Sequence, residues 1–200
     1  MNYPDYFSDG YSFSRWWYQG VPEWGEQIKS ILPQESRRYF LEIGAYEGLS
    51  TVMTIENMLD DGDSIFVVDA WSGLSDEGED LAGVYQTYWS NISNAKQLFP
   101  EREVTTMRMR SDQAMFGLIT AGYEFDFVYV DGSHETSQVA TDVRLGWELL
   151  SKGGVMVCDD YEWQDESENN RPRDAIDRFI GISKDIQVLF QGQQIGIRKL

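Results

Sequence analysis

The sequence is poor in several kinds of residue on which whole classes of protein depend. Cys158 is the only cysteine, so the chain can form no internal disulfide, and its apolar neighbours predict a small buried side chain without a catalytic role. No apolar run approaches the length of a membrane-spanning helix, and residues 1–5 lack the basic and apolar character of a secretory signal. We therefore expect a globular, cytoplasmic protein without a membrane partner.

Positive charge is also scarce. The 16 lysines and arginines stand against 34 aspartates and glutamates, which gives a formal net charge of -18. Such a charge repels the phosphates of nucleic acids and of anionic lipids, and no cluster of basic residues suggests a local basic groove. The composition therefore argues against a nucleic-acid partner.

What remains is a regular alternation of short apolar strands and helices. The 200 residues suit one α/β domain (1–200), in which an N-terminal aromatic segment and helix (1–38) precede a core (39–200) with an insertion at about 71–98. The expected strands are 39–43, 64–69, 104–109, 125–131, one that opens at Gly153 and Gly154, 186–190 and 194–198; the expected helices are 23–32, 49–59, 84–99, 136–150 and 174–180. This order predicts a doubly wound, Rossmann-like α/β fold whose seven-stranded sheet is mostly parallel and ends in an antiparallel C-terminal hairpin.

Sheets of this kind bind ligands beyond the carboxyl ends of their strands. After the first strand, Gly44 and Gly48 allow a sharp turn and a close approach to a ligand, and Ser50 offers a further donor. The turn suits the carboxylate end of an amino-acid-like cofactor, although a tight turn that binds nothing has the same pattern. Asp69 ends the second strand about twenty residues later, where an acidic side chain commonly accepts both hydroxyls of a ribose.

Ser111 and Asp112 follow the third expected strand. They are placed to contact an adenine edge, but the same residues also suit the N-cap of a helix that needs no ligand. The sequence leaves both interpretations open.

Three carboxylates follow the fourth and fifth expected strands, which are neighbours in a sheet of this class. Asp131 comes after the fourth strand, and Asp159 and Asp160 come after the fifth. Like charges that close repel one another unless a cation or a shared proton relieves them. Oxygen ligands favour a hard ion, so this grouping predicts a Mg²⁺ site.

His134 is the only histidine and lies three residues beyond Asp131. A neutral imidazole beside a metal-bound hydroxyl can accept its proton, whereas a structural role would be to cap the following helix or to stack on adenine. Trp71 and Trp163 sit just past Asp69 and Asp160, where each either lines an acceptor pocket or packs against the protein.

With these residues in view, the chain resembles class I S-adenosylmethionine-dependent methyltransferases from about Tyr39 to the C-terminal hairpin. The turn from Leu41 to Ser50 is very similar to that of catechol-type O-methyltransferases, and Asp131–His134 followed by Asp159–Tyr161 is similar to the macrocin-type sugar O-methyltransferases. The resemblance implies that the methionine portion of S-adenosylmethionine contacts Glu42, Gly44, Tyr46, Gly48 and Ser50, its ribose Asp69, and its adenine Ser111 and Asp112. It also implies that Mg²⁺ binds Asp131, Asp159 and Asp160. Asp131 is expected to contact the cofactor as well and to act in catalysis with His134, which occupies the place of the lysine base of catechol-type enzymes.

The leading hypothesis is therefore Mg²⁺-assisted methylation of a hydroxyl on a small-molecule acceptor, with sugars or polyols first and phenols second. A nicotinamide-dependent oxidoreductase on a Rossmann-like fold is the alternative, but residues 44–48 lack the Gly-x-Gly-x-x-Gly spacing that it would need. The third hypothesis is a non-catalytic cofactor-binding protein. A homodimer is a further expected partner.

Overall fold

A computed structural model describes residues 8–15, 21–73, 78, 80–163 and 171–200. Its centre is a seven-stranded sheet in the order β3-β2-β1-β4-β5-β7-β6. The strands from β1 to β5 pair in parallel, and β7 runs antiparallel to both β5 and β6. The predicted fold class is confirmed, including the C-terminal hairpin. The strands are β1 (Tyr39–Ile43), β2 (Ser64–Asp69), β3 (Glu103–Arg108), β4 (Phe125–Val130), β5 (Leu150–Cys158), β6 (Ile186–Gln191) and β7 (Ile195–Lys199).

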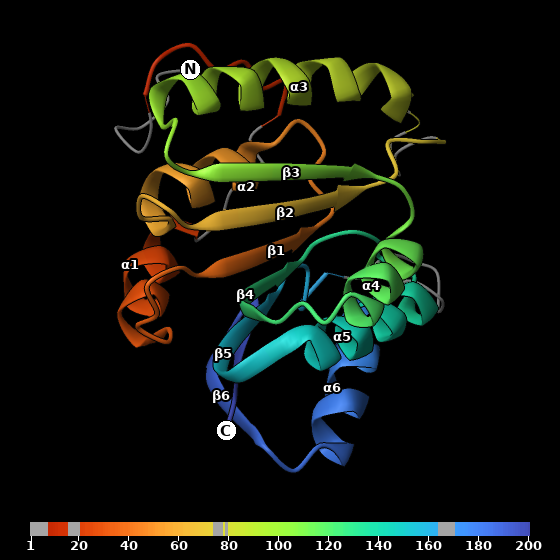
Figure 1. Cartoon of the computed structure of the whole chain (residues 1–200). Helices are drawn as coiled ribbons and strands as arrows, with labels where there is room; N and C mark the ends of the chain where they lie inside the picture. Colours follow the sequence, from red (N-terminus) through yellow and green to blue (C-terminus); the bar gives the residue numbers. More distant parts are fainter. Residues whose placement is uncertain (1–7, 16–20, 74–77, 79, 164–170) are drawn as a thin grey trace.

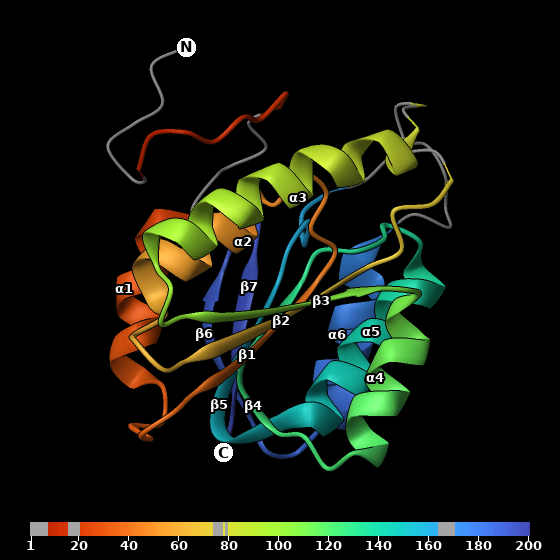
Figure 2. The ribbon, with the colours of Figure 1, turned by 45° about the horizontal axis from the view of Figure 1, so that its top comes forward.

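Helices cover both faces of the sheet (Figures 1 and 2). Strand residues alternate between the two layers: Phe40 of β1 packs into one apolar cluster, and its neighbours Leu41 and Ile43 pack into the other. This alternation fixes the register of β1, because a slip by one residue would exchange the two faces. One face carries α1 (Val21–Ile31), α2 (Leu49–Met53), the π-helical turn η1 (Thr54–Met58) and α3 (Leu81–Leu98); the other carries α4 (Ser111–Thr120), α5 (Thr136–Leu149) and α6 (Pro172–Ile182).

The helix predicted over 49–59 is confirmed to within one residue, but only its first part is α-helical. The α-helix ends at Met53, and the following turn closes with a hydrogen bond from Leu59 N to Thr54 O (3.0 Å), five residues back. Leu59 is already extended, with φ −76° and ψ 140°, and its side chain is buried. The last turn before this buried leucine is therefore π-helical.

No apolar period predicted the extent of α4 between the third and fourth strands, although the N-cap interpretation of Ser111 and Asp112 allowed a helix there. Its periodicity is blurred because Phe116 and Ile119 are apolar but exposed, and Gly117 interrupts the helix interior. The other boundaries differ from the expected ones by no more than three residues; the largest shifts are at the start of α3, at Leu81, and at the start of β5, at Leu150 directly after α5.

The described part of the chain holds no helix that combines the length and the apolar character needed to cross a membrane.

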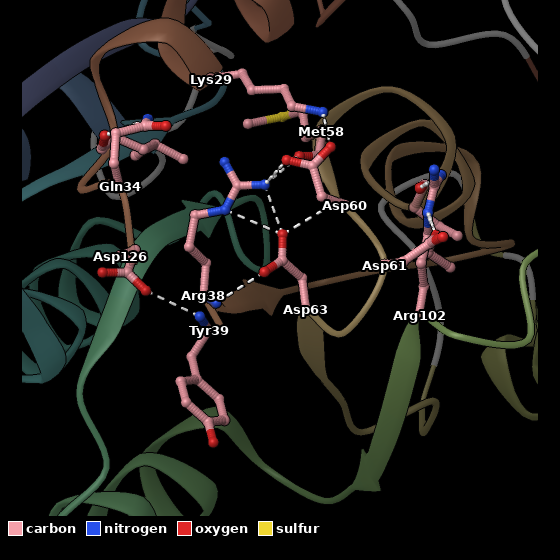
Figure 3. A network of polar contacts seen from close by, with 12 residues as sticks. Lys29, Gln34, Arg38, Tyr39, Met58, Asp60, Asp61, Asp63, Arg102 and Asp126 are labelled. Atoms are coloured by element: carbon pink, nitrogen blue, oxygen red, sulfur yellow. Dashed lines mark hydrogen bonds and ion pairs between the residues drawn. The ribbon is translucent and has the colours of Figure 1, made fainter. Parts of the chain in front are cut away.

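At the amino ends of β1 and β2, Arg38 joins the acidic turn that precedes β2 (Figure 3). Its guanidinium donates to Asp63 Oδ2 from Nε (3.0 Å) and Nη2 (2.6 Å), and to Asp60 Oδ2 (2.6 Å). Lys29 of α1 donates to the other oxygen of Asp60 (2.6 Å). The side chains of Arg38 and Asp63 are 6% and 5% exposed, so this ion pair is buried, whereas Asp60, through which Lys29 links α1 to Arg38, is 62% exposed.

Candidate functional site

The loops that follow the strands meet along the carboxyl edge of the sheet. Gly44 N donates to Val68 O (2.9 Å), Asp131 N to Ile43 O (2.8 Å), and Asp159 N to Val130 O (2.9 Å). These bonds link the ends of β2, β1, β4 and β5 in turn. The structure therefore brings the glycine turn and the expected carboxylates to one edge, as predicted from the strand order.

Gly44 is required where this edge is tightest. Its φ is +83°, and a Cβ atom built on it would lie 1.9 Å from the carbonyl oxygen of Asp131 and 2.6 Å from Cα of Gly132. Gly48, with φ +84°, faces the ring of Tyr88, where a Cβ would lie 3.0 Å from Cδ2. The backbone of the turn thus lies directly against the loop after β4, which only glycine permits.

Glu42 anchors this turn from inside the sheet. Its carboxyl group is buried and accepts hydrogen bonds from the hydroxyls of Ser50 and Thr51, the latter at 2.5 Å. Burial raises the pKa of Glu42 to about 7, and the nearby charge of Asp69 adds to the rise. Glu42 therefore fixes the start of α2 through the hydrogen bonds that it accepts from Ser50 and Thr51.

Asp69 is held by the same turn. Its Oδ2 accepts from Ala45 N (2.9 Å) and Tyr46 N (3.1 Å), and its Oδ1 accepts from Trp71 N (2.7 Å). One acceptor position remains, on Oδ1, because an ionised carboxylate has about four acceptor positions and three of them are used. The carboxylate is thus fixed at the end of β2 next to the glycine turn.

Trp71 packs in the protein interior and does not line a pocket. Its side chain is fully buried, its Nε1 donates to Tyr46 O (2.8 Å), and its ring contacts Tyr88 and Tyr85 at centroid distances of 4.4 and 4.8 Å. Tyr46 and Trp71 have φ of +48° and +40°, which is unusual for residues with a side chain. The tryptophan therefore supports the backbone of the turn.

Ser111 and Asp112 open α4, but neither is its N-cap. That position belongs to Arg110, which makes no capping bond with its side chain and instead pairs with Asp112 (3.2 Å). Ser111 Oγ donates to Asp142 of α5 (2.7 Å). The capping interpretation is wrong for both residues, and the adenine interpretation stays a prediction.

The carboxylates at the ends of β4 and β5 share one environment. Asp159 Oδ2 accepts from the hydroxyl of Tyr129 and from Gln194 Nε2 (2.7 Å), and its Oδ1 accepts from Asp160 N (2.7 Å). Burial raises the pKa of Asp131 well above its ordinary value, and the charges of Asp159, Asp160 and Glu42 raise it further. The acids are close enough to oppose one another's ionisation.

His134 lies over this group and is bound to it. Its Nε2 is 2.7 Å from Asp160 Oδ2, and its ring stacks on Trp163 at a centroid distance of 4.2 Å. Asp160 has φ +53°, so the backbone bends sharply where its side chain turns toward His134. The N-cap of α5 is Glu135, so the alternative of His134 as a helix cap is wrong.

Comparison with known proteins identifies the family of the chain. Residues 41–161 match the model of a family described as a methyltransferase domain, and this segment is more than half of the chain. The chain belongs to this methyltransferase family. The match confirms the identification as a class I S-adenosylmethionine-dependent methyltransferase and decides against the nicotinamide-dependent oxidoreductase.

One curated relative of the methyltransferase is the uncharacterized protein R132 of Acanthamoeba polyphaga mimivirus. The two are 25% identical over 128 residues, which are 62% of this chain and 51% of the relative. The methyltransferase therefore spans about half the length of that protein.

Solved structures with the same fold include three described as methyltransferases. A putative rRNA-methylase from Clostridium thermocellum has a TM-score of 0.64 at 11% identity, covering 92% of this chain and 98% of its own. An O-methyltransferase from Bacillus cereus in complex with SAH has a TM-score of 0.57 at 19% identity, covering 81% and 74%. MycE, from the mycinamycin biosynthetic pathway, with Mg and SAH, has a TM-score of 0.60 at 16% identity, covering 97% and 52%. At these identities the likeness shows the fold of the methyltransferase.

The methyltransferase has the right kind of side chains to bind a divalent ion, but these side chains are not oriented to bind one. Asp131, Asp159 and Asp160 supply oxygen ligands in a place where a cation would relieve their repulsion. Within the described ranges, however, no group of three or more His, Cys, Asp or Glu side chains is placed to hold a metal ion. Asp160 turns to His134, and Asp159 turns to Tyr129 and Gln194. The residues fit Mg²⁺ in kind, and its ligation requires rotation of these side chains.

Four side chains that support the site are missing from the sequence-based prediction. Tyr129 and Gln194 hold Asp159, and Gln138 and Asp142 hold Ser111. Tyr129 could have been found, because it lies two residues before Asp131 and strand side chains alternate. Asp142 had a weaker signal as a lone acid on the apolar face of α5, and Gln194 had none.

Proposed function

We propose that the methyltransferase moves the methyl group of S-adenosylmethionine to a hydroxyl of a small molecule, with Mg²⁺ bound at the carboxyl edge of the sheet. The observation that carries this proposal is the carboxylate cluster of Asp131, Asp159 and Asp160 beside the glycine turn. Among the described residues none of the three is paired with a lysine or arginine, and the pKa values of Asp131 and Asp159 are raised. Such perturbed acids in one place are typical of functional sites.

The glycine turn and Asp69 are the proposed cofactor site. Gly44 and Gly48 set the path of the backbone at the end of β1, and Asp69 keeps an acceptor position on Oδ1 for a ribose hydroxyl. Both the Bacillus cereus structure and MycE are described in complex with SAH, which supports this assignment. The proposed contacts to the methionine portion are Glu42, Gly44, Tyr46, Gly48, Ser50 and Asp131, and those to adenine are Ser111 and Asp112.

Asp131, Asp159 and Asp160 would hold Mg²⁺, as MycE is described with Mg. When bound there, the ion would fix and acidify the acceptor hydroxyl. His134, on the loop that follows Asp131, would accept the hydroxyl proton. The new bond joins the acceptor oxygen to the methyl carbon as the bond between that carbon and the sulfonium sulfur breaks.

The proposed acceptor is a sugar or polyol hydroxyl, and a phenol is second. A MycE structure is described with mycinamycin VI, a small molecule, while another neighbour is described as a putative rRNA-methylase. The net charge of -18 favours the small molecule over RNA. We also propose that residues 1–200 act as one domain and that the chain forms a homodimer.

The test separates the cofactor from the metal. Calorimetry with S-adenosylmethionine measures the first step, and an absence of binding at millimolar cofactor would refute the proposal. A screen of sugars, polyols, phenols and RNA with labelled cofactor then identifies the acceptor. With that acceptor, Asp131→Ala and Asp159→Ala are compared with Asp61→Ala, an exposed acid at the opposite edge, across a Mg²⁺ titration. Equal transfer in all three variants would eliminate the metal role and leave the cofactor role standing.

A further inference from the structure

Asp142 is a buried acid that the proposed reaction does not use. It lies on α5 on the same buried face as Val139 and Val143, and it is 1% exposed. Its Oδ1 accepts from Ser111 Oγ (2.7 Å) and from Gln138 Nε2 (3.0 Å). Gln138 Nε2 also donates to Ser111 Oγ (3.1 Å). The three side chains form a closed triangle of hydrogen bonds between α4 and α5.

The hydrogens of this triangle can be assigned one by one. The amide nitrogen of Gln138 can only donate, and it shares one hydrogen between Asp142 Oδ1 and Ser111 Oγ, because these two acceptors lie only 2.7 Å apart. The Ser111 hydroxyl has a single hydrogen, and that hydrogen goes to Asp142. Toward any further group, Ser111 Oγ can therefore only accept a hydrogen bond.

The triangle lies beside the cofactor loops. Ser111 follows Met109, whose N–H donates to the carbonyl of Asp69 (3.1 Å). On its other side, Asp142 Oδ2 is 3.6 Å from the place that a Cβ atom on Gly132 would take, and Gly132 follows Asp131. The triangle thus sits between the proposed ribose ligand and the carboxylate loop.

We propose that Asp142 is a positioning residue that holds Ser111 as an acceptor and so makes the cofactor site selective for a purine with an amino group at its 6-position. This inference rests on the proposed contact between Ser111 and adenine. Adenine presents a donor at N6 to such an acceptor. Hypoxanthine presents a carbonyl there, and two facing acceptors leave both groups unpaired.

The test compares the affinities of S-adenosylhomocysteine and S-inosylhomocysteine, which differ at the 6-position of the base, by calorimetry. The intact protein is expected to prefer the adenosyl compound. Asp142→Leu, of similar size, removes the acceptor and frees the Ser111 hydrogen to donate to a carbonyl, so the ratio of affinities should fall about tenfold. Asp142→Asn keeps a carbonyl acceptor and should restore the ratio. Gln138→Leu is the matched control, because it removes a bond to the same hydroxyl but leaves its hydrogen on Asp142.

Ser111→Ala separates this inference from the proposed function. If S-adenosylhomocysteine binds and Ser111→Ala keeps the ratio, the contact of Ser111 with adenine is wrong and the inference falls with it. If Ser111→Ala lowers the ratio but folded Asp142→Leu does not, the inference alone is overturned. An equal fall in Gln138→Leu would also overturn it. Thermal melting checks folding, and Asp142→Ala replaces the leucine variant if that variant does not fold.

Discussion

The two ends of the parallel sheet treat acidic side chains in opposite ways. At the amino end, Asp60 and Asp63 receive the charges of Arg38 and Lys29, and the hydrogen bond from Lys29 is the largest cause that lowers the pKa of Asp60. At the carboxyl end, Asp159 accepts from the neutral groups of Tyr129 and Gln194 and from a backbone amide. Burial raises its pKa. Asp60 and Asp63 are thus paired with cations, whereas Asp159 is held by neutral groups alone.

Backbone strain is distributed in the same way. The described residues other than glycine that have positive φ are Tyr46, Trp71 and Asp160, and all three lie just past the carboxyl ends of strands. Conformations of this kind cost free energy and persist where the surrounding structure holds them, often at functional sites. The amino end of the sheet thus carries the buried ion pair, and the carboxyl end carries the strained backbone conformations and the acids with raised pKa values.

A methyl group added to a glycine at each end should have very different effects. Gly44→Ala is expected to abolish measurable binding of S-adenosylmethionine and to cost several kcal/mol of stability, because its Cβ would lie 1.9 Å from the Asp131 carbonyl oxygen. Gly62→Ala, at the amino end, has φ +95° but no atom within 4 Å of its Cβ, so it should cost only about 1 kcal/mol of backbone strain. Calorimetry and urea unfolding measure both effects. Similar losses in the two variants would show that φ alone matters.

Removing the buried cation at the amino end should destabilise the fold. Arg38→Met leaves the buried Asp63 without its partner and is expected to lower the free energy of unfolding by about 3 to 5 kcal/mol. Arg37→Met is the matched control, since the Arg37–Glu103 pair is 41% and 64% exposed and should contribute less than about 1 kcal/mol. Urea unfolding compares the two. A loss below about 1 kcal/mol in Arg38→Met would mean that the network in Figure 3 does not stabilise the protein.

Neutralising one acid at each end should change stability in opposite directions. Asp131→Asn removes a charge from a repelling group, so stability should hold or rise while methyl transfer to the screened acceptor falls at least about hundredfold. Asp63→Asn leaves the Arg38 guanidinium without its carboxylate, so stability should fall while transfer by the folded protein stays near the wild-type rate. Equal stability losses in both variants would contradict the contrast between the two ends.

The fold was predictable because it depends on local patterns that repeat along the chain. Alternating strand residues and short turns placed the seven strands and the C-terminal hairpin correctly. The errors fall where tertiary demands override the local pattern. The second part of the helix after β1 is π-helical, and exposed Phe116 hides the periodicity of α4.

The site was predictable only in part, for a related reason. Residues that follow strands, such as Asp131 and Asp159, could be placed because parallel strands end at one edge. The partners that orient them come from other elements: Gln194 from the C-terminal hairpin and Asp142 from the middle of α5. Their roles depend on packing between distant segments, which no spacing in the sequence records.

The smallest expected effect is a pH dependence that belongs to the carboxyl end. Because the pKa of Glu42 is raised to about 7 in the folded chain, from 4.5, the folded state keeps its proton where the unfolded state loses it. Stability from this group is fully present below about pH 4.5 and is lost as pH rises through about 7.

Glu42→Gln mimics the protonated form, so it should match the wild type near pH 5 and be more stable by on the order of 2 kcal/mol at pH 8. Urea unfolding of the cofactor-free protein across this range measures the difference, and Glu124→Gln at an exposed position controls for net charge. A constant difference between Glu42→Gln and the wild type at every pH would show that Glu42 is already ionised in the folded protein at pH 5.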